Sequence, residues 1–197
     1  MHTENTQKTT LRLPGAPGVW LFVLLDSSIF AILFLSFTLE KIANPDTYAA
    51  DMSAMNVTLG SINTIILLTS SWLMALATQE VKNVGTANIG KIKILISSAA
   101  ALGIIFTFCK INEYIHVVES GHTLNSSSFY MYYFVTTGLH LLHVVIGIIS
   151  LSIICATAIK AESENTRGFV ETVATYWHMV DFLWVMIFPL FYLAVPK

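Results

Sequence analysis

The sequence predicts an all-α fold: a polytopic membrane protein built as a bundle of five transmembrane helices. Of its 197 residues, 55% are hydrophobic and only 11% are charged, and the mean hydropathy is +0.69. This composition is too apolar for an ordinary soluble domain. The apolar residues also fall into five blocks, each with the roughly 20 residues that a helix needs to cross the hydrocarbon core. Strands of a membrane barrel would be about half as long and would alternate in polarity.

The five predicted spans follow one another with polar connections. They cover residues 17–39, 57–79, 92–112, 129–159 and 170–195. The fourth is longer than a bilayer requires, so we expect it to tilt or to protrude. The first is too long for a signal-peptide core and contains Asp26, so we interpret it as a span. The sequence therefore predicts one five-helix domain over residues 17–197, preceded by a polar N-terminal tail over residues 1–16.

Basic residues predict the orientation of the bundle. With the N-terminus in the cytoplasm, that side carries seven basic residues, and the other side carries three. The seven are Lys8, Arg12, Lys82, Lys91, Lys93, Lys160 and Arg167; the three are Lys41, Lys110 and Lys197. Because cytoplasmic loops are enriched in Lys and Arg, we expect a cytoplasmic N-terminus and an outer C-terminus in a bacterial-type inner membrane. A net charge of −2 excludes a nucleic-acid footprint.

Polar side chains inside the predicted spans form the candidate site. An ionisable group at bilayer depth is costly unless it is paired or hydrated, so each one needs an explanation. The candidate residues are Asp26, Glu113, His140, His143, Glu171, Trp177, His178, Asp181 and Trp184.

In the last two spans, the candidate residues lie on helical stripes. In the fifth span, Glu171, His178 and Asp181 follow steps of three and four, flanked by Trp177 and Trp184. In the fourth span, Thr136, His140, His143 and Gly147 do the same, and Gly138 and Gly147 would admit a close helix neighbour. We expect the two stripes to face one another in an interhelical hydrogen-bond network, with Asp181 fixing the tautomer of His178 or of a fourth-span histidine.

Two other interpretations of these residues remain open. "EYIH", Glu113 to His116, has the Glu-x-x-His spacing of di-iron bundles, and "HLLH" could offer two imidazoles to one metal ion. A di-iron site would need a second such pair at the same depth. A proton relay through the acids and histidines is the other alternative, but the chain shows no internal repeat, and Pro189 predicts only a mild kink. Cys109 and Cys155 show no metal or disulfide spacing.

Four motifs, in order, resemble subunit III of the haem-copper oxidases. They are "LFVLLDSSIF" with a buried acid, "KINEYIH" with its Glu-Tyr pair, "TTGLHLLHVVIG" and "ETVATYWHMVDFLW". The resemblance covers all five spans and is to the five-helix form of the family. Among five-helix members, "RLPGAPGVWLFVLLD", "LGSINTIILLTSSWLMALA" and "YYFVTTGLHLLHVVIG" look most like the nitric-oxide-reductase-associated E branch, followed by the quinol and cytochrome c oxidase subunits. Thr78, Gln79 and Glu80 depart from the family, in which many members have a histidine here.

The resemblance implies an accessory subunit with no catalytic centre, haem, copper or other metal of its own. Family members dock on the catalytic haem-copper subunit, which carries haem and copper or non-haem iron. They hold phospholipids against it and support its assembly, its proton supply and its resistance to inactivation in respiratory electron transport. By resemblance, His178 and Asp181 lock helices together, and Asp26 lies near bound lipid or the catalytic subunit. The alternative function is an independent membrane enzyme with its own metal site of histidines and carboxylates.

Overall fold

The computed structural model describes residues 15–83, 87–157 and 164–193, and within these ranges it is helical with no strand. Five helices are long and apolar enough to cross a membrane. Four of them are α1 (Pro17–Ala43), α3 (Val57–Lys82), α4 (Ile89–Glu119) and α5 (Ser128–Ala156). The fifth span, Thr166–Leu193, covers most of α6 (Glu164–Phe188) and the π-helical turn that follows it (Pro189–Leu193). The predicted fold class and the five spans are confirmed. Residues 1–14 of the predicted tail lie outside the described residues.

Short polar side chains set where several helices begin. The side chains of Asn56 and Asn88 accept hydrogen bonds of 3.0 Å from the backbone N–H groups of Leu59 and Lys91, which open α3 and α4. Ser127 accepts one of 3.3 Å at the start of α5. Each cap satisfies a backbone donor that has no partner inside its helix. These capping residues mark the starts of α3, α4 and α5 in the sequence.

A short helix, α2 (Pro45–Ser53), was not among the predicted elements. Pro45 opens it and Asp46 lies in its first turn, both common signals of a helix start. Tyr48 is buried, with its ring centroid 5.3 Å from that of Phe37 and 5.9 Å from that of Phe129. Burial raises the pKa of the Tyr48 hydroxyl, which therefore stays protonated. Through these contacts α2 closes the end of the bundle between α1 and α5.

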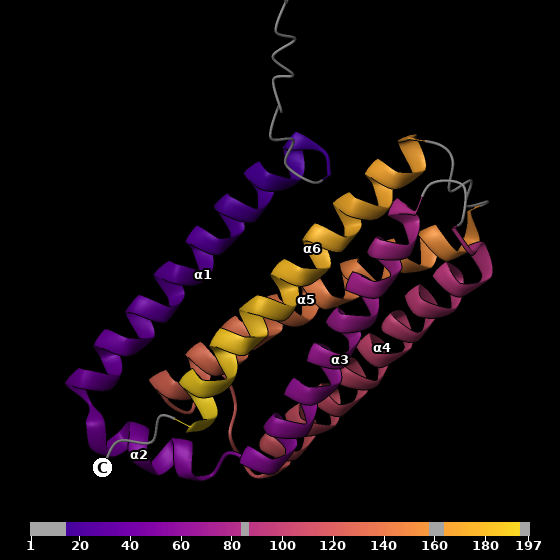
Figure 1. Cartoon of the computed structure of the whole chain (residues 1–197). Helices are drawn as coiled ribbons and strands as arrows, with labels where there is room; N and C mark the ends of the chain where they lie inside the picture. The colour runs from indigo at the N-terminus through magenta and orange to yellow at the C-terminus, as the bar shows by residue number, and fades with distance from the viewer. Residues whose placement is uncertain (1–14, 84–86, 158–163, 194–197) are drawn as a thin grey trace, which may run out of the picture.

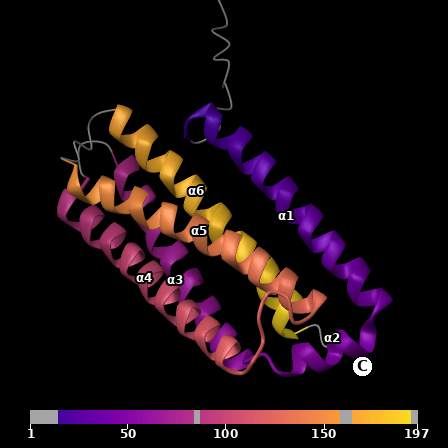
Figure 2. The ribbon, with the colours of Figure 1, turned by 180° about the vertical axis from the view of Figure 1, so that it is seen from behind.

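The long helices form two layers with α1 at one edge. Figure 1 shows α3 and α6 next to one another in front of α4 and α5, and Figure 2 shows α5 from the opposite side. Within the bundle, α3 packs on α4 and α6, and α5 packs on α4 and α6. The first helix contacts α5 and α6, which separate it from α3 and α4. Because α1 is the least enclosed of the five spans, its neighbours on α5 and α6 decide how it is held.

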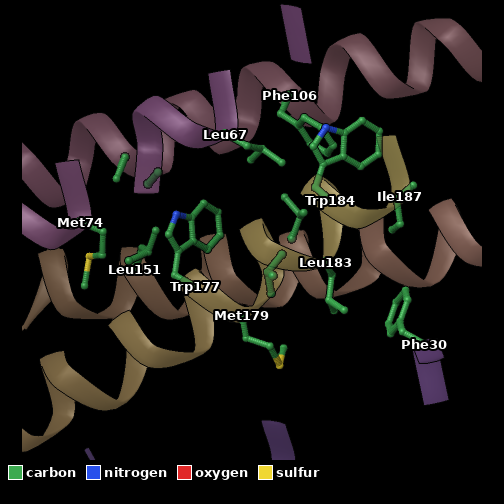
Figure 3. Packing of buried hydrophobic residues seen from close by; sticks show 14 of the residues in the cluster. Phe30, Leu67, Met74, Phe106, Leu151, Trp177, Met179, Leu183, Trp184 and Ile187 are labelled. Atoms are coloured by element: carbon green, nitrogen blue, oxygen red, sulfur yellow. The ribbon is translucent and has the colours of Figure 1, made fainter. Parts of the chain in front are cut away.

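Two tryptophans of α6 occupy the centre of the bundle (Figure 3). Trp177 lies over two glycines: a Cβ on Gly103 would meet Trp177 Cη2 at 2.9 Å, and a Cβ on Gly147 would overlap the same ring more severely. The predicted close approach at Gly147 is confirmed. The same prediction for Gly138 was wrong, because a Cβ there would meet nothing within 4 Å.

Pro189 ends α6, and a π-helical turn follows it. Proline has no N–H, and its ring conflicts with the carbonyl of the preceding turn. The chain accommodates it with a π-helical turn, Pro189–Leu193, a wider turn that often occurs at functional sites. This turn places Phe191 and Tyr192 in the core, and the ring of Phe191 lies 4.5 Å from that of Phe37. The last residues of the fifth span therefore tie α6 to α1.

Candidate functional site: buried polar clusters

Asp26 and His143 join α1 to α5. Both are largely buried, and His143 Nε2 lies 3.1 Å from Asp26 Oδ1. His143 Nδ1 lies 2.8 Å from the carbonyl oxygen of Leu139, and since a carbonyl only accepts, Nδ1 carries a proton. The contact between Nε2 and Oδ1 then needs one further proton, held on either atom. The Tyr176 hydroxyl donates to the His143 carbonyl at 2.9 Å, which adds α6 to the same junction.

A second cluster was missed by sequence reasoning except for Glu113. Lys110 Nζ donates to the hydroxyls of Tyr133 and Tyr192 at 2.8 and 2.7 Å and lies 3.2 Å from Glu113 Oε2. Both hydroxyls donate in turn to Glu113 Oε1. The ammonium therefore has two hydrogen-bond acceptors and one carboxylate oxygen at ion-pair distance. A buried charge of this kind is tolerated only when it is paired and hydrogen-bonded.

This cluster fastens α4, α5 and the π-helical turn at the end of the bundle where α2 lies. It also corrects the charge count used for orientation. Lys110 is fully buried and paired, so it is not a loop charge. Removing it from the outer three leaves two, and the asymmetry becomes seven to two. The Lys-Glu spacing of three on one helix was the signal that could have identified the pair.

The tryptophans and His178 of α6 form hydrogen bonds with α3. Trp177 Nε1 donates to Ser70 Oγ at 3.1 Å, and Trp184 Nε1 donates to Thr64 Oγ1 at 3.0 Å. His178 Nδ1 lies 2.7 Å from Ser71 Oγ. The α5 and α6 stripes do contact one another, since His140 stacks on Trp184, but the expected hydrogen bonds between them were wrong: these α6 side chains bond hydroxyls of α3 rather than the histidines of α5.

Asp181 and His140 are buried without hydrogen-bond partners among the described residues. Asp181 is 3% exposed and lies beside Ser71, but neither of its oxygens forms a hydrogen bond of good geometry there, so the expected bond to His178 or to an α5 histidine is absent. His140 stacks on Trp184 with ring centroids 5.2 Å apart, and neither ring nitrogen is paired. An ion alone in this setting would cost far more than a neutral group. Both groups are therefore neutral packing elements of the core.

Glu171 lies at the opposite end of α6 and connects three segments. Its Oε2 accepts a hydrogen bond of 3.3 Å from the Gly15 N–H, and its Oε1 lies 3.4 Å from Lys82 Nζ of α3. Beside it, Thr172 Oγ1 accepts from the Ala16 N–H at 2.9 Å. The start of α1 is thus attached to α6. The nine predicted residues therefore belong to several separate junctions rather than to one network.

Comparison with known proteins shows which family this chain is similar to. The family model "Cytochrome c oxidase subunit III" matches residues 2–195. The chain belongs to the cytochrome c oxidase subunit III family. Cytochrome c oxidase subunit 3 of Synechocystis sp. is 34% identical over 180 residues, 89% of this chain and 74% of the relative. Quinol oxidase subunit 3 of Bacillus subtilis is 30% identical over 89% of this chain and 85% of the relative. The heme-copper oxidase subunit I+III of Aeropyrum pernix is 27% identical over 90% of this chain, which corresponds to 22% of that longer protein.

This subunit III chain does not assemble the metal site suggested by its sequence. No group of three or more His, Cys, Asp or Glu in the described ranges is arranged to hold a metal ion. His116 is 87% exposed and lies 3.8 Å from Glu119, whereas Glu113 points into the Lys110 cluster. His140 faces Trp184 while His143 faces Asp26, so "HLLH" does not present two imidazoles to one ion. Among the described residues, the pairs at Asp26–His143, Lys110–Tyr133 and Trp177–Ser70 connect helices.

Proposed function

We propose that this chain is a non-redox accessory subunit of a respiratory haem-copper oxidase. The observation that carries the proposal is the family match over residues 2–195, together with five helices long and apolar enough to span a membrane. Among the described residues, no group of three or more His, Cys, Asp or Glu could hold a metal ion. Asp26 pairs with His143, and Lys110 pairs with Glu113 and Tyr133. The chain then acts by supporting a catalytic partner rather than by reacting with substrate.

The partner in this proposal is a catalytic haem-copper subunit. The Aeropyrum pernix relative supports it, because its name describes subunits I and III in one polypeptide and this chain matches only 22% of it. The relatives named above are oxidase subunits, which favours a parent complex that reduces oxygen with cytochrome c or quinol as donor. The resemblance to the nitric-oxide-reductase-associated branch remains a prediction and is the second candidate.

We also propose that phospholipid binds in a groove between α1, α5 and α6. The groove has a volume of about 440 Å³ and its lining is mainly apolar. Val19, Phe22, Ile146, Ser150, Val173 and Tyr176 line it. Phe22 and Tyr176 also flank the ring of His143, with centroids 6.2 and 6.5 Å away, so an acyl chain here would lie beside the Asp26–His143 pair. A lipid would thus fill the space next to the Asp26–His143 contact between α1 and α5.

Native mass spectrometry of the gently solubilised complex tests the proposal. Membranes that express the chain with an affinity tag are extracted in a mild detergent. We expect a complex whose mass includes this chain, a haem-containing catalytic subunit and bound phospholipid. Recovery of the chain alone, under conditions in which other membrane complexes stay intact, would contradict the proposal.

A further inference from the structure

Trp72 is the tryptophan whose position the bundle does not explain. The sequence has four tryptophans. Trp177 and Trp184 are buried and hydrogen-bonded, and Trp20 lies near one end of α1. Trp72 lies near the middle of α3 and is 63% exposed, and its indole N–H has no partner among the described residues. Tryptophans that face lipid normally lie at the membrane interface, where the N–H group reaches water.

His178 lies at a similar depth on the neighbouring helix. It is near the middle of the segment Thr166–Leu193 and is partly exposed. Its Nδ1 contacts Ser71, the residue next to Trp72, so the two rings belong to adjacent positions along the α3–α6 contact. Its Nε2 has no partner within the part of the chain that the structure describes. Two ring nitrogens near the middle of their spans are thus without a partner among the described residues.

Outward hydroxyl groups elsewhere in the spans do not need an external partner. On α1, α4 and α5, Ser28, Thr107 and Ser150 each donate to a carbonyl four residues earlier, at 2.7, 2.9 and 2.9 Å. Such bonds satisfy a hydroxyl inside its own helix. Among the rings, His143 does the same, with its Nδ1 2.8 Å from the carbonyl oxygen of Leu139, four residues earlier. Trp72 Nε1 of α3 and His178 Nε2 of α6 form no such bond in the described ranges.

Exposed apolar side chains surround these two rings. The α3/α6 face consists of Ile65, Leu68 and Trp72 of α3 with His178, Phe182 and Val185 of α6. The layer that carries it lies toward the viewer in Figure 1. Hydrocarbon can neither accept the indole proton nor pair the imidazole, whereas a protein helix can do both. Tryptophan is also prominent among the residues that dominate the energy of protein interfaces.

We propose that the α3/α6 face is the docking surface for a transmembrane helix of the catalytic haem-copper subunit. That helix supplies a hydrogen-bond acceptor to Trp72 Nε1 and a polar partner to His178 Nε2, within an otherwise apolar contact. The proposal rests on the proposed function. The relative named subunit I+III favours the catalytic subunit over a second copy of this chain as the occupant.

Site-specific photo-crosslinking in the intact complex tests the docking face. The photoreactive residue p-benzoyl-phenylalanine replaces Trp72 in one variant and Phe108 in a control variant. Phe108 is 68% exposed on α4, in the other layer. We expect a crosslink to the haem-containing subunit from position 72 and much less from position 108. Crosslinks from position 72 to lipid alone or to a second copy of this chain, or a stronger crosslink to the catalytic subunit from position 108, would overturn the docking face.

A conservative substitution supplies the second test. Trp72→Phe removes the N–H group but keeps an aromatic ring, and Phe108→Leu is its matched control. Loss of one interhelical hydrogen bond in a membrane should weaken association about threefold. The haem-to-chain ratio across a series of detergents measures this. Equal ratios in the two variants would overturn the role of Trp72, whereas absence of haem in the wild-type preparation would instead refute the proposed function.

Discussion

Replacing Gly147 with alanine tests how Trp177 is held at the centre of the bundle. A Cβ at this position would overlap ring carbons of Trp177, which is fully buried. The ring cannot move away freely, because Gly103 lies against its other edge and its N–H is bonded to Ser70. Overpacking of this kind costs about 1–3 kcal/mol. A broken Trp177–Ser70 bond would add about 1 kcal/mol, and alanine in place of a helical glycine would offset about 0.5–1 kcal/mol.

The expected result for Gly147→Ala is a net destabilisation of about 1–3 kcal/mol. Thermal unfolding in detergent, followed by circular dichroism, measures it, with roughly 2–4 °C of Tm per kcal/mol for a chain of this size. Gly138→Ala is the matched control on the same helix, since a Cβ there meets nothing within 4 Å. It should leave Tm unchanged or raise it slightly. If the two variants unfold at the same temperature, the packing of Trp177 on Gly147 is wrong.

Three further predictions concern the charged groups and the topology. Lys110→Met should destabilise the chain by about 3–5 kcal/mol because it leaves Glu113 unpaired, and adding Glu113→Gln should recover much of the loss in the same thermal assay. Equal Tm values for the single and double variants would contradict the pairing. Asp181→Asn should preserve assembly, turnover and Tm, because neither carboxyl oxygen forms a hydrogen bond of good geometry among the described residues, whereas Asp181→Ala should lower Tm through lost packing. Normal assembly without turnover in the Asn variant would show that Asp181 takes part in the chemistry of the complex. In a chain without its native cysteines, a cysteine at Asn125 should be labelled from outside intact cells and one at Asn5 should not, and the reverse pattern would invert the proposed orientation.

The spans could be predicted from sequence because bilayer thickness fixes their length and because hydrocarbon requires apolar residues along it. The close approach at Gly147 was also predictable in kind, since small residues mark helix contacts in membranes. Gly138 carried the same signal and has no neighbour, so composition alone could not show which glycine is packed. The short helix α2 was missed because it lies between spans, and hydropathy does not detect it.

The partners of the polar residues could not be predicted because they depend on the order of helices around the bundle. His178 and the α6 tryptophans face α3, and His143 faces α1, although a pairing of α5 with α6 satisfied the same periodicity. Lys110 was counted among the basic residues of the outer side, because the two tyrosines that bind it are remote in sequence and gave no sign that it is buried. Sequence indicated which polar residues lie inside the spans, and tertiary structure assigned their contacts.

The central claim is that this chain supports a haem-copper catalytic subunit and carries no redox centre itself. The most direct measurement is the absorption spectrum and metal content of the purified complex, followed by the same measurements on this chain after it is separated from its partners. The account predicts a Soret band in the complex that leaves with the catalytic subunit, and no stoichiometric iron or copper in the separated chain. A Soret band, or about one metal ion per chain, that stays with this chain alone would contradict it.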